Sequence, residues 1–224
     1  MDNTYLSAHY NRVHLRGQAA TVPALSHANH GESFYRFLLS VPRLSGQTDL
    51  LPVLVPEQLL EETPVEADET YAVAGQLRSF NSRSCEGPRL ILSIFARELR
   101  REKGPGCNHI LLSGTICKSP SFRQTPLGRE ICDVILAVNR HYGRADYLPC
   151  ISWGAVARKT AQLEVGDDLG LEGRVQSRIY RKNVEGEVEE HTAYEVSVMR
   201  PLPPEELMRQ SFSVDGWDAG AYNR

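Results

Sequence analysis

The chain has 224 residues, of which 41% are hydrophobic and 24% are charged, and its formal net charge is −3. This composition is typical of a globular protein, and its longest apolar runs, such as Leu50–Val55, are far too short to form a membrane-spanning helix. Acidic and basic side chains nearly balance in each half of the chain, so any affinity for a polyanion must come from basic groups gathered on one face.

Short motifs disfavour several other classes of protein. The N-terminus has no basic segment followed by an apolar core, so no secretory signal is expected, and the predicted location is the cytoplasm, in association with the nucleoid. Five cysteines without a C-x-x-C pair favour reduced structural thiols. His27 and His30 have the spacing H-x-x-H without further ligands, and zinc needs three or four, so no metal or other cofactor is predicted.

An internal repeat divides the chain. The segment Asn11–Gly17 reappears as Asn108–Gly114, a shift of 97 residues. The same shift places a second set of residues on identical partners, namely Val41, Arg43, Gly46, Asp49, Leu51 and Pro52 on Val138, Arg140, Gly143, Asp146, Leu148 and Pro149. One constant offset across separated segments indicates two copies of one fold.

The boundary between the copies is predicted in the stretch Arg97–Cys107, where glycine and proline interrupt the apolar pattern. Its basic side chains could contact phosphate, but a solvated linker is the favoured interpretation. We therefore predict a divergent first domain over residues 1–103, a second domain over 108–202 and a C-terminal tail over 203–224.

Each copy is predicted to contain five strands and one helix. In the first copy the helix is short, at Pro56–Glu62. In the second copy we predict strands at Ile110–Leu112, Ile131–Val138 and Tyr147–Trp153, a helix at Ala155–Leu163 ended by Gly166, and strands at Leu169–Tyr180 and Ala193–Met199. This order is that of an OB-fold barrel, a fold that commonly binds oligonucleotides. The predicted fold class is all-β with short helices, in two tandem OB-fold five-stranded barrels.

Alternation along the predicted strands separates a core face from a candidate binding face, because successive residues of a strand point to opposite sides. On the fourth strand of the second copy, one parity suits the core and carries Leu169, Leu171, Val175 and Ile179. The other parity carries Arg174, Gln176, Arg178 and Tyr180. On the third strand, Tyr147, Ile151 and Trp153 share one side.

Rings beside basic groups are what sequence-tolerant single-strand binding requires, because every base offers a stackable face and every phosphate offers a charge. Trp153 has an alternative interpretation: it stands immediately before Gly154 and could close the end of the barrel.

Four segments of the second copy resemble successive landmarks of the bacterial single-stranded DNA-binding proteins, in the order of that family. They are Gly128–Ile131, Leu136–Arg140, Ala145–Gly154 and Glu172–Tyr180. The resemblance is strong over about residues 108–200 and weak over 11–97, where it depends on the internal repeat.

The resemblance implies positions for base stacking and for phosphate contacts. Stacking rings are expected at Tyr147, Trp153 and Tyr180, with a further position near His141 or Tyr142 in the loop after the second strand. Candidate partners of phosphates or bases are Arg123, Arg140, Arg144, Arg174 and Arg178, with Gln176 beside them. Arg123 and Arg144 lie in loops, where an ordinary surface arginine is an open alternative.

The first copy and the tail depart from the family pattern. The repeat places Leu50, Pro56 and Ser82 opposite the three rings, so the first barrel either binds DNA weakly or serves assembly. Its candidate rings are Phe34, Tyr35, Phe37 and Phe80; Phe34 and Phe37 differ in parity, so at least one is expected in the core. The tail ends without the acidic tip usual in the family, and Trp217 or Tyr222 is a candidate anchor for replication or repair proteins, with a disordered or barrel-packed tail as the alternative.

The predicted function is single-stranded DNA binding and protection in replication, recombination or repair, without catalysis. No phosphate-binding loop, zinc-protease helix or nucleophile elbow occurs in the sequence. The alternative is a replication-restart or protein-interaction accessory module that kept the fold and binds DNA weakly. The resemblance also implies a homodimer that presents four OB domains, and no membrane association.

Overall fold

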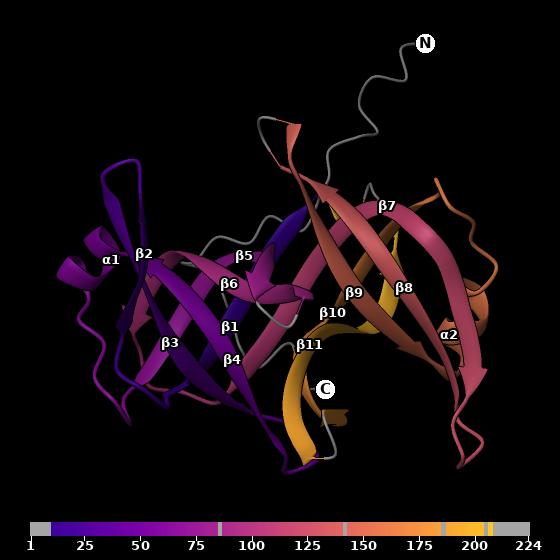
Figure 1. Cartoon of the computed structure of the whole chain (residues 1–224), viewed down its shortest axis with the longest axis horizontal. Coiled ribbons are helices and arrows are strands. Elements are labelled where there is room, and N and C mark those ends of the chain that lie inside the picture. Colours follow the sequence, from indigo (N-terminus) through magenta and orange to yellow (C-terminus); the bar gives the residue numbers. More distant parts are fainter. Residues whose placement is uncertain (1–9, 85–86, 141–142, 185–186, 204–205, 208–224) are drawn as a thin grey trace.

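The structure is a computed structural model that describes residues 10–84, 87–140, 143–184, 187–203 and 206–207. Within these residues, eleven strands form one continuous sheet that closes on itself twice, which gives two barrels side by side (Figure 1). No helix in this part of the chain is long and apolar enough to cross a membrane.

The first barrel contains five strands that close in the order β1-β3-β4-β6-β5-β1. They are β1 (Asn11–Ala19), β3 (Glu32–Pro42), β4 (Thr48–Pro56), β5 (Thr70–Ser84) and β6 (Gly87–Arg101). A short strand, β2 (Ala24–Asn29), extends the sheet as a hairpin with β3, and the helix α1 (Glu57–Glu62) connects β4 to β5.

The second barrel repeats this topology in the order β7-β8-β9-β11-β10-β7. Its strands are β7 (Cys107–Gln124), β8 (Glu130–Asn139), β9 (Ala145–Trp153), β10 (Asp168–Val184) and β11 (Glu187–Leu202), with the helix α2 (Gly154–Thr160) between β9 and β10. In both barrels the strand before the helix pairs in parallel with the last strand. This strand order is that of the OB fold, so the predicted all-β fold class is confirmed.

Several predicted boundaries in the second barrel are wrong. The fourth and fifth strands extend beyond Leu169–Tyr180 and Ala193–Met199, over Asp168–Val184 and Glu187–Leu202. The first strand is much longer than Ile110–Leu112, because its exposed distal half forms a hairpin with β8 that reaches Gln124 opposite Glu130. The helix ends at Thr160 instead of Leu163, since the N–H groups of Gln162 and Leu163 donate to carbonyls three residues back and tighten the last turn.

The two barrels are joined by the antiparallel pairing of β1 with β7, from Asn11 opposite Leu112 to Arg16 opposite Cys107. Asn11 and Leu15 of the first copy are equivalent to Asn108 and Leu112 of the second. The pairing is therefore symmetric, since Asn11 faces Leu112 and Leu15 faces Asn108. Each of these two asparagines also bonds, through its side chain, to the backbone of the fourth strand of its own barrel, at Leu77 and Val175.

A pair of equivalent polar contacts crosses between the barrels, and we call them the crosswise latches. In one, the buried Asp49 accepts hydrogen bonds from Arg43 (2.7 Å to Nε) and from the backbone N–H of Ser177 (2.7 Å), while Arg43 also donates to the Ser177 carbonyl (2.7 Å). In the other, Asp146 accepts from Arg140 (2.6 Å) and from the N–H of Ser79 (2.5 Å).

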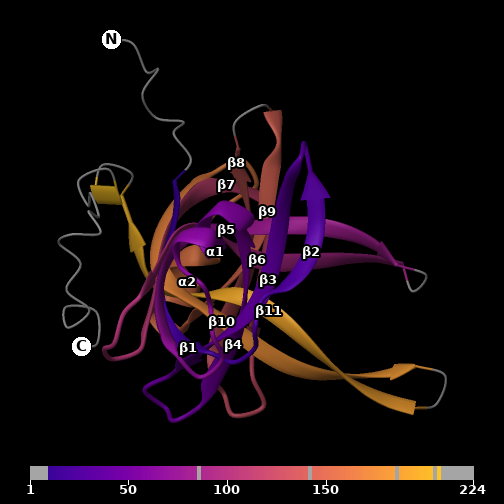
Figure 2. The same cartoon turned by 90° about the vertical axis from the view of Figure 1, so that its left-hand side faces the viewer.

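The long hairpins β5–β6 and β10–β11 extend from the barrels toward the same side of the molecule (Figure 2). The extension explains another wrong prediction. Ile179 has the parity of the core residues Leu171 and Val175, yet it is 67% exposed, because β10 has left the barrel at this point.

Replacing Asp49 by alanine tests the crosswise latches. The change leaves Arg43 and the Ser177 N–H without their shared acceptor, and breaking a buried pair from one side costs roughly 3 kcal/mol. We expect the free energy of unfolding, measured by urea titration, to fall by about this amount, and replacing the exposed neighbour Thr48 to have little effect. A loss no larger than that of the Thr48 variant would show that the latch does not stabilise the chain.

Acid is predicted to weaken the junction through His14, which is buried and faces His109 across the β1–β7 pairing. Burial, together with His109 and Arg12, lowers the pKa of His14 to about 4 from 6.5. Between these values the unfolded chain binds a proton that the folded chain does not, so stability falls as the pH falls, by up to about 3 kcal/mol.

The matched variant for this pH dependence is His14→Leu, because Leu111 occupies the equivalent position of the second copy. Urea unfolding at pH 7 and pH 5 should show a smaller loss of stability in the variant than in the unchanged chain. Equal losses in the two proteins would contradict the assignment to His14.

Candidate nucleic-acid interface

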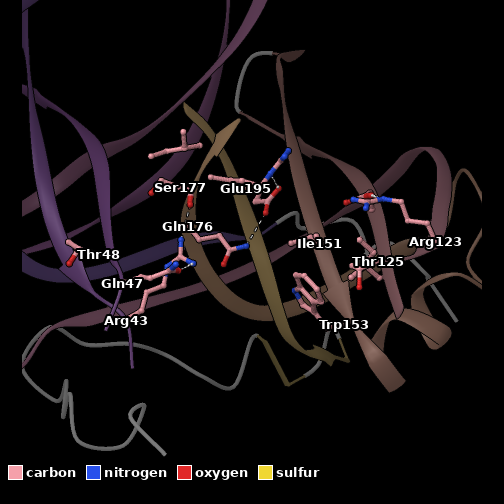
Figure 3. Close-up of a pocket in the computed structure, with 14 residues that line it drawn as sticks. Arg43, Gln47, Thr48, Arg123, Thr125, Ile151, Trp153, Gln176, Ser177 and Glu195 are labelled. Atoms are coloured by element: carbon pink, nitrogen blue, oxygen red, sulfur yellow. Dashed lines mark hydrogen bonds and ion pairs between the residues drawn. The ribbon is translucent and has the colours of Figure 1, made fainter. Parts of the chain in front are cut away.

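A groove of about 720 Å³ lies on the outer face of the second barrel (Figure 3). Four strands of this barrel, β8 to β11, contribute Ile131, Ile151, Trp153, Gln176, Arg178 and Glu195. The turn between β3 and β4 of the first barrel contributes Arg43, Gln47 and Thr48 from the opposite side. The groove is therefore a composite of both halves of the chain.

Trp153 lies at the C-terminal end of β9, at the edge of this groove (Figure 3). Its side chain is 40% exposed and points away from the barrel interior, which places the ring on the candidate binding face and not at the closed end of the barrel. Gly154 follows with a φ of +54°, a conformation that lets the chain turn directly from β9 into α2. Ile151, two residues earlier, is buried on the groove floor.

Gln176 and Arg178 line the groove from β10, as their alternation predicts. The Gln176 side chain donates to the buried carboxylate of Glu195 at 2.9 Å, and the exposed Arg178 guanidinium lies 3.7 Å from the same carboxylate. Arg123 lies near the end of β7, paired with Ile131, and not in a loop as predicted. It lines the groove and donates to Asp133 at 2.9 Å.

Tyr180 lies beyond the barrel rim, on the extended part of β10, at a second groove of about 660 Å³. Its exposed ring is stacked with His191 at 5.6 Å between centroids, and the Arg178 guanidinium lies 5.9 Å from its centre. Arg36 and Leu90 of the first barrel line the same groove. Arg178 therefore connects the two grooves, since it lines the first and contacts the ring in the second.

Tyr147 and Arg140 line neither of these two grooves. They lie where the second barrel meets β5. The Tyr147 side chain is 48% exposed, and its N–H donates to the Ser79 hydroxyl at 2.8 Å. The Arg140 guanidinium is held by Asp146 and by the Ser79 carbonyl, so it serves a crosswise latch before any contact with a ligand.

The remaining predicted residues occupy three different places. Arg174 lines a smaller groove of about 330 Å³ with Met199 and Pro42. Arg144 is exposed in the turn closed by a hydrogen bond from the Arg140 N–H to its carbonyl. His141 and Tyr142 lie outside the described residues, as do Cys85, Trp217 and Tyr222.

The electrostatics of the composite groove are balanced. Each of its three guanidiniums stands beside a carboxylate, in the pairs Arg43–Asp49, Arg123–Asp133 and Arg178–Glu195. The Arg123–Asp133 pair is exposed and can exchange partners at small cost, and the exposed Arg178 guanidinium lies 3.7 Å from Glu195, so both arginines can be reached by a phosphate from solvent.

Sequence reasoning missed the contribution of the first barrel and the carboxylates. Arg43 and Asp49 match Arg140 and Asp146 in the repeat, and this coincidence was the available signal that both pairs are structural. Gln47, Thr48 and Glu195 carry no comparable mark, because their place at the groove depends on how the barrels are joined.

Among the described cysteines, Cys107, Cys132 and Cys150 are buried and Cys117 is exposed. Cys107, Cys117, Cys132 and Cys150 are free thiols, and burial raises the pKa of Cys107 to about 11, which keeps it protonated. His27 stacks on Phe34 with centroids 5.1 Å apart.

The fold and the composite groove define a protein of two joined OB-fold barrels, with an exposed ring and paired guanidiniums on the outer face of the second. Among solved structures, wild-type single-stranded DNA binding protein from Thermus aquaticus matches with a TM-score of 0.68 at 21% identity, over 87% of this chain and 92% of that one. This likeness concerns the fold and includes both barrels.

Comparisons of sequence identify the family. The profile of the single-strand binding protein family matches residues 107–202. Single-stranded DNA-binding protein B of Bacillus subtilis is 37% identical over 108 residues, which are 44% of this chain and 95% of that protein. Single-stranded DNA-binding protein 2 of Listeria monocytogenes is 36% identical over 83 residues, 34% of this chain and 52% of that protein. The chain belongs to the single-strand binding protein family, which confirms the resemblance found in the sequence.

Proposed function

We propose that the protein binds single-stranded DNA across the outer face of the second barrel and protects it, without catalysis. The observation that carries the proposal is the convergence of Trp153, Gln176, Arg178 and Arg123 on one solvent-open groove. Unpaired bases stack on exposed rings, and guanidiniums neutralise phosphates and release their counterions. Family membership supports the same ligand.

The strand is proposed to run from Trp153 along β10 to Tyr180. Arg178 lies between the groove at Trp153 and the groove at Tyr180. Its guanidinium is exposed and can contact a phosphate of a strand that runs from one ring to the other. The face is open along its length and offers repeated ring and guanidinium contacts, an arrangement suited to holding a strand of any sequence. The accessory-module alternative is less favoured, because such a module would have no need to keep these rings exposed.

Removing both rings, as Trp153→Ala with Tyr180→Ala, should weaken binding of fluorescein-labelled oligothymidylate. Each stacked base contributes roughly 1 to 3 kcal/mol, so the double change is expected to cost at least about 30-fold in affinity. Both side chains are exposed, so the fold should survive.

The matched control for this pair is Phe122→Ala, which removes an exposed ring from β7. Fluorescence anisotropy measures binding at several salt concentrations, and circular dichroism checks folding. A double variant that is folded and binds as tightly as the chain without substitutions would refute the proposed site. Failure of the chain without substitutions to bind would refute the proposed function.

We also propose that two chains associate and present four barrels, as the family resemblance implies, and that the C-terminal tail recruits replication or repair proteins in the cytoplasm, at the nucleoid. Analytical ultracentrifugation of the full chain should give about 50 kDa, twice the 25.1 kDa of one chain. A mass of one chain at micromolar concentration would refute the dimer.

A further inference from the structure

Strand β2 is an open edge of the sheet in the part of the chain that the structure describes. It belongs to neither barrel and pairs with β3 alone, from Ala24 opposite Arg36 to Asn29 opposite Glu32. The β2–β3 hairpin projects from the first barrel on the side away from the second barrel (Figures 1 and 2). All six residues of β2 are exposed, and they line none of the three grooves described above. One side of β2 therefore presents backbone N–H and C=O groups to solvent.

The hairpin presents this edge as a regular strand. His30 and Gly31 form its turn with φ values of +51° and +81°, and two positive values are what a two-residue turn with the twist of a hairpin requires. His27 stacks on the buried Phe34 and so fixes one face of β2 against the barrel. The other face carries Leu25, which is 65% exposed.

The side chains of Leu25 and Ala28 point to the same side of β2. Leu25 pairs with Tyr35 and Ala28 with Ser33, and these two residues of β3 share one parity. His27 pairs with Phe34, which has the other parity. Leu25 and Ala28 therefore form a small apolar strip along the open edge, on the side away from His27.

The equivalent segment of the second copy is protected against the addition of another strand, whereas β2 is not. The shift of 97 residues places Ala24–Asn29 on Ser121–Pro126. That segment contains Pro126 and also Arg123, which forms an ion pair with Asp133. Charges and prolines on an edge are the means by which proteins prevent edge-to-edge pairing. Strand β2 has no proline and no acidic, lysine or arginine side chain.

Register shifts do not account for this difference between the two hairpins. The pairing of β2 with β3 shifts once, between Leu25 and His27, and the pairing of β7 with β8 shifts twice, between Ile116 and Ser121. Bulges occur in both copies, so the contrast lies in the side chains along the edge.

The open edge of β2 is complementary to itself. When two copies pair antiparallel over the whole strand, Ala24 of each faces Asn29 of the other, and Leu25 of each faces Ala28 of the other. A large apolar side chain then meets a small one twice, and no charge faces its like. Cross-strand pairs of this kind stabilise a sheet.

The contact is small for a permanent interface. Six residues a side are far fewer than the roughly 20 to 30 a side of a stable complex, so free assemblies would separate readily. A single strand of DNA that holds two assemblies next to each other raises the effective concentration of one edge for the other. The proposed dimer has one such edge on each chain, so it can contact a neighbour through either.

We propose that the open edge of β2 pairs antiparallel with the same edge of another copy of this chain, and thereby joins assemblies that lie side by side on one strand of DNA. The proposal rests on the proposed function, because DNA is what brings the assemblies together. The partner is a second copy, since the edge and its apolar strip match their own two-fold image.

The test uses the full chain and two oligothymidylates, one that holds a single assembly and one twice as long. Fluorescence titration gives the ratio of the second binding constant to the first, corrected for statistics. We expect a ratio of about ten for the chain without substitutions, from the added cross-strand contacts. Leu25→Lys with Ala28→Lys should bring the ratio close to one, because like charges then face each other.

A charge reversal distinguishes self-pairing from a change in the hairpin itself. Leu25→Glu with Ala28→Glu should lose the cooperative step as the lysine pair does, whereas an equimolar mixture of the two variants should recover part of it, since a lysine then faces a glutamate. The matched control is Leu127→Lys, which adds a charge at an 83% exposed leucine of the equivalent hairpin and should leave the ratio unchanged.

The outcomes separate this inference from the proposed function. A chain that binds the shorter oligothymidylate but has a ratio of one on the longer overturns the inference and leaves the proposed function standing. The same holds if both charged variants keep the ratio of the chain without substitutions, or if their mixture recovers nothing. Failure of the chain without substitutions to bind either oligothymidylate refutes the proposed function, and the inference with it.

Discussion

The pairing of β1 with β7 is the constraint on which the arrangement of the surface depends. It merges two barrels into one sheet, and the crosswise latches fix the angle between them, because Asp49 and Asp146 are each 1% exposed and each needs donors from both barrels. A buried carboxylate that lost these donors would be costly, so the latches favour one relative orientation. As a result, the β3–β4 turn forms a wall of the groove on the second barrel, and Arg140 in turn stands over Phe80 of the first.

The outer faces of the two barrels differ in the arrangement of their rings and charges. The groove of the second barrel offers exposed rings with guanidiniums already paired to carboxylates, so base stacking would carry much of the binding there. On the first barrel, Arg97 and Arg78 lie 4.9 Å and 5.9 Å from the centre of the Phe95 ring, and Arg140 of the second barrel lies 5.5 Å from that of Phe80.

Much of the fold was predictable because equivalent residues of the two copies are separated by a nearly constant number of positions. One offset placed both barrels, and strand alternation placed Trp153, Arg178 and Tyr180 on the outside. Alternation failed for Ile179, because parity holds only while the strand stays in the barrel, and it could not find Arg97, because a bulge changes the parity. The internal role of Arg140 and the first-barrel wall of the groove depend on contacts between residues 61 to 134 positions apart, which local patterns do not encode.

The most direct test of the account is a crystal structure of the full chain with an oligothymidylate long enough to span both barrels. The account predicts bases stacked against Trp153 and Tyr180, phosphates beside Arg178, and an unchanged β1–β7 junction with both latches intact. A strand bound away from these rings, or barrels that separate at the junction to admit it, would contradict the account.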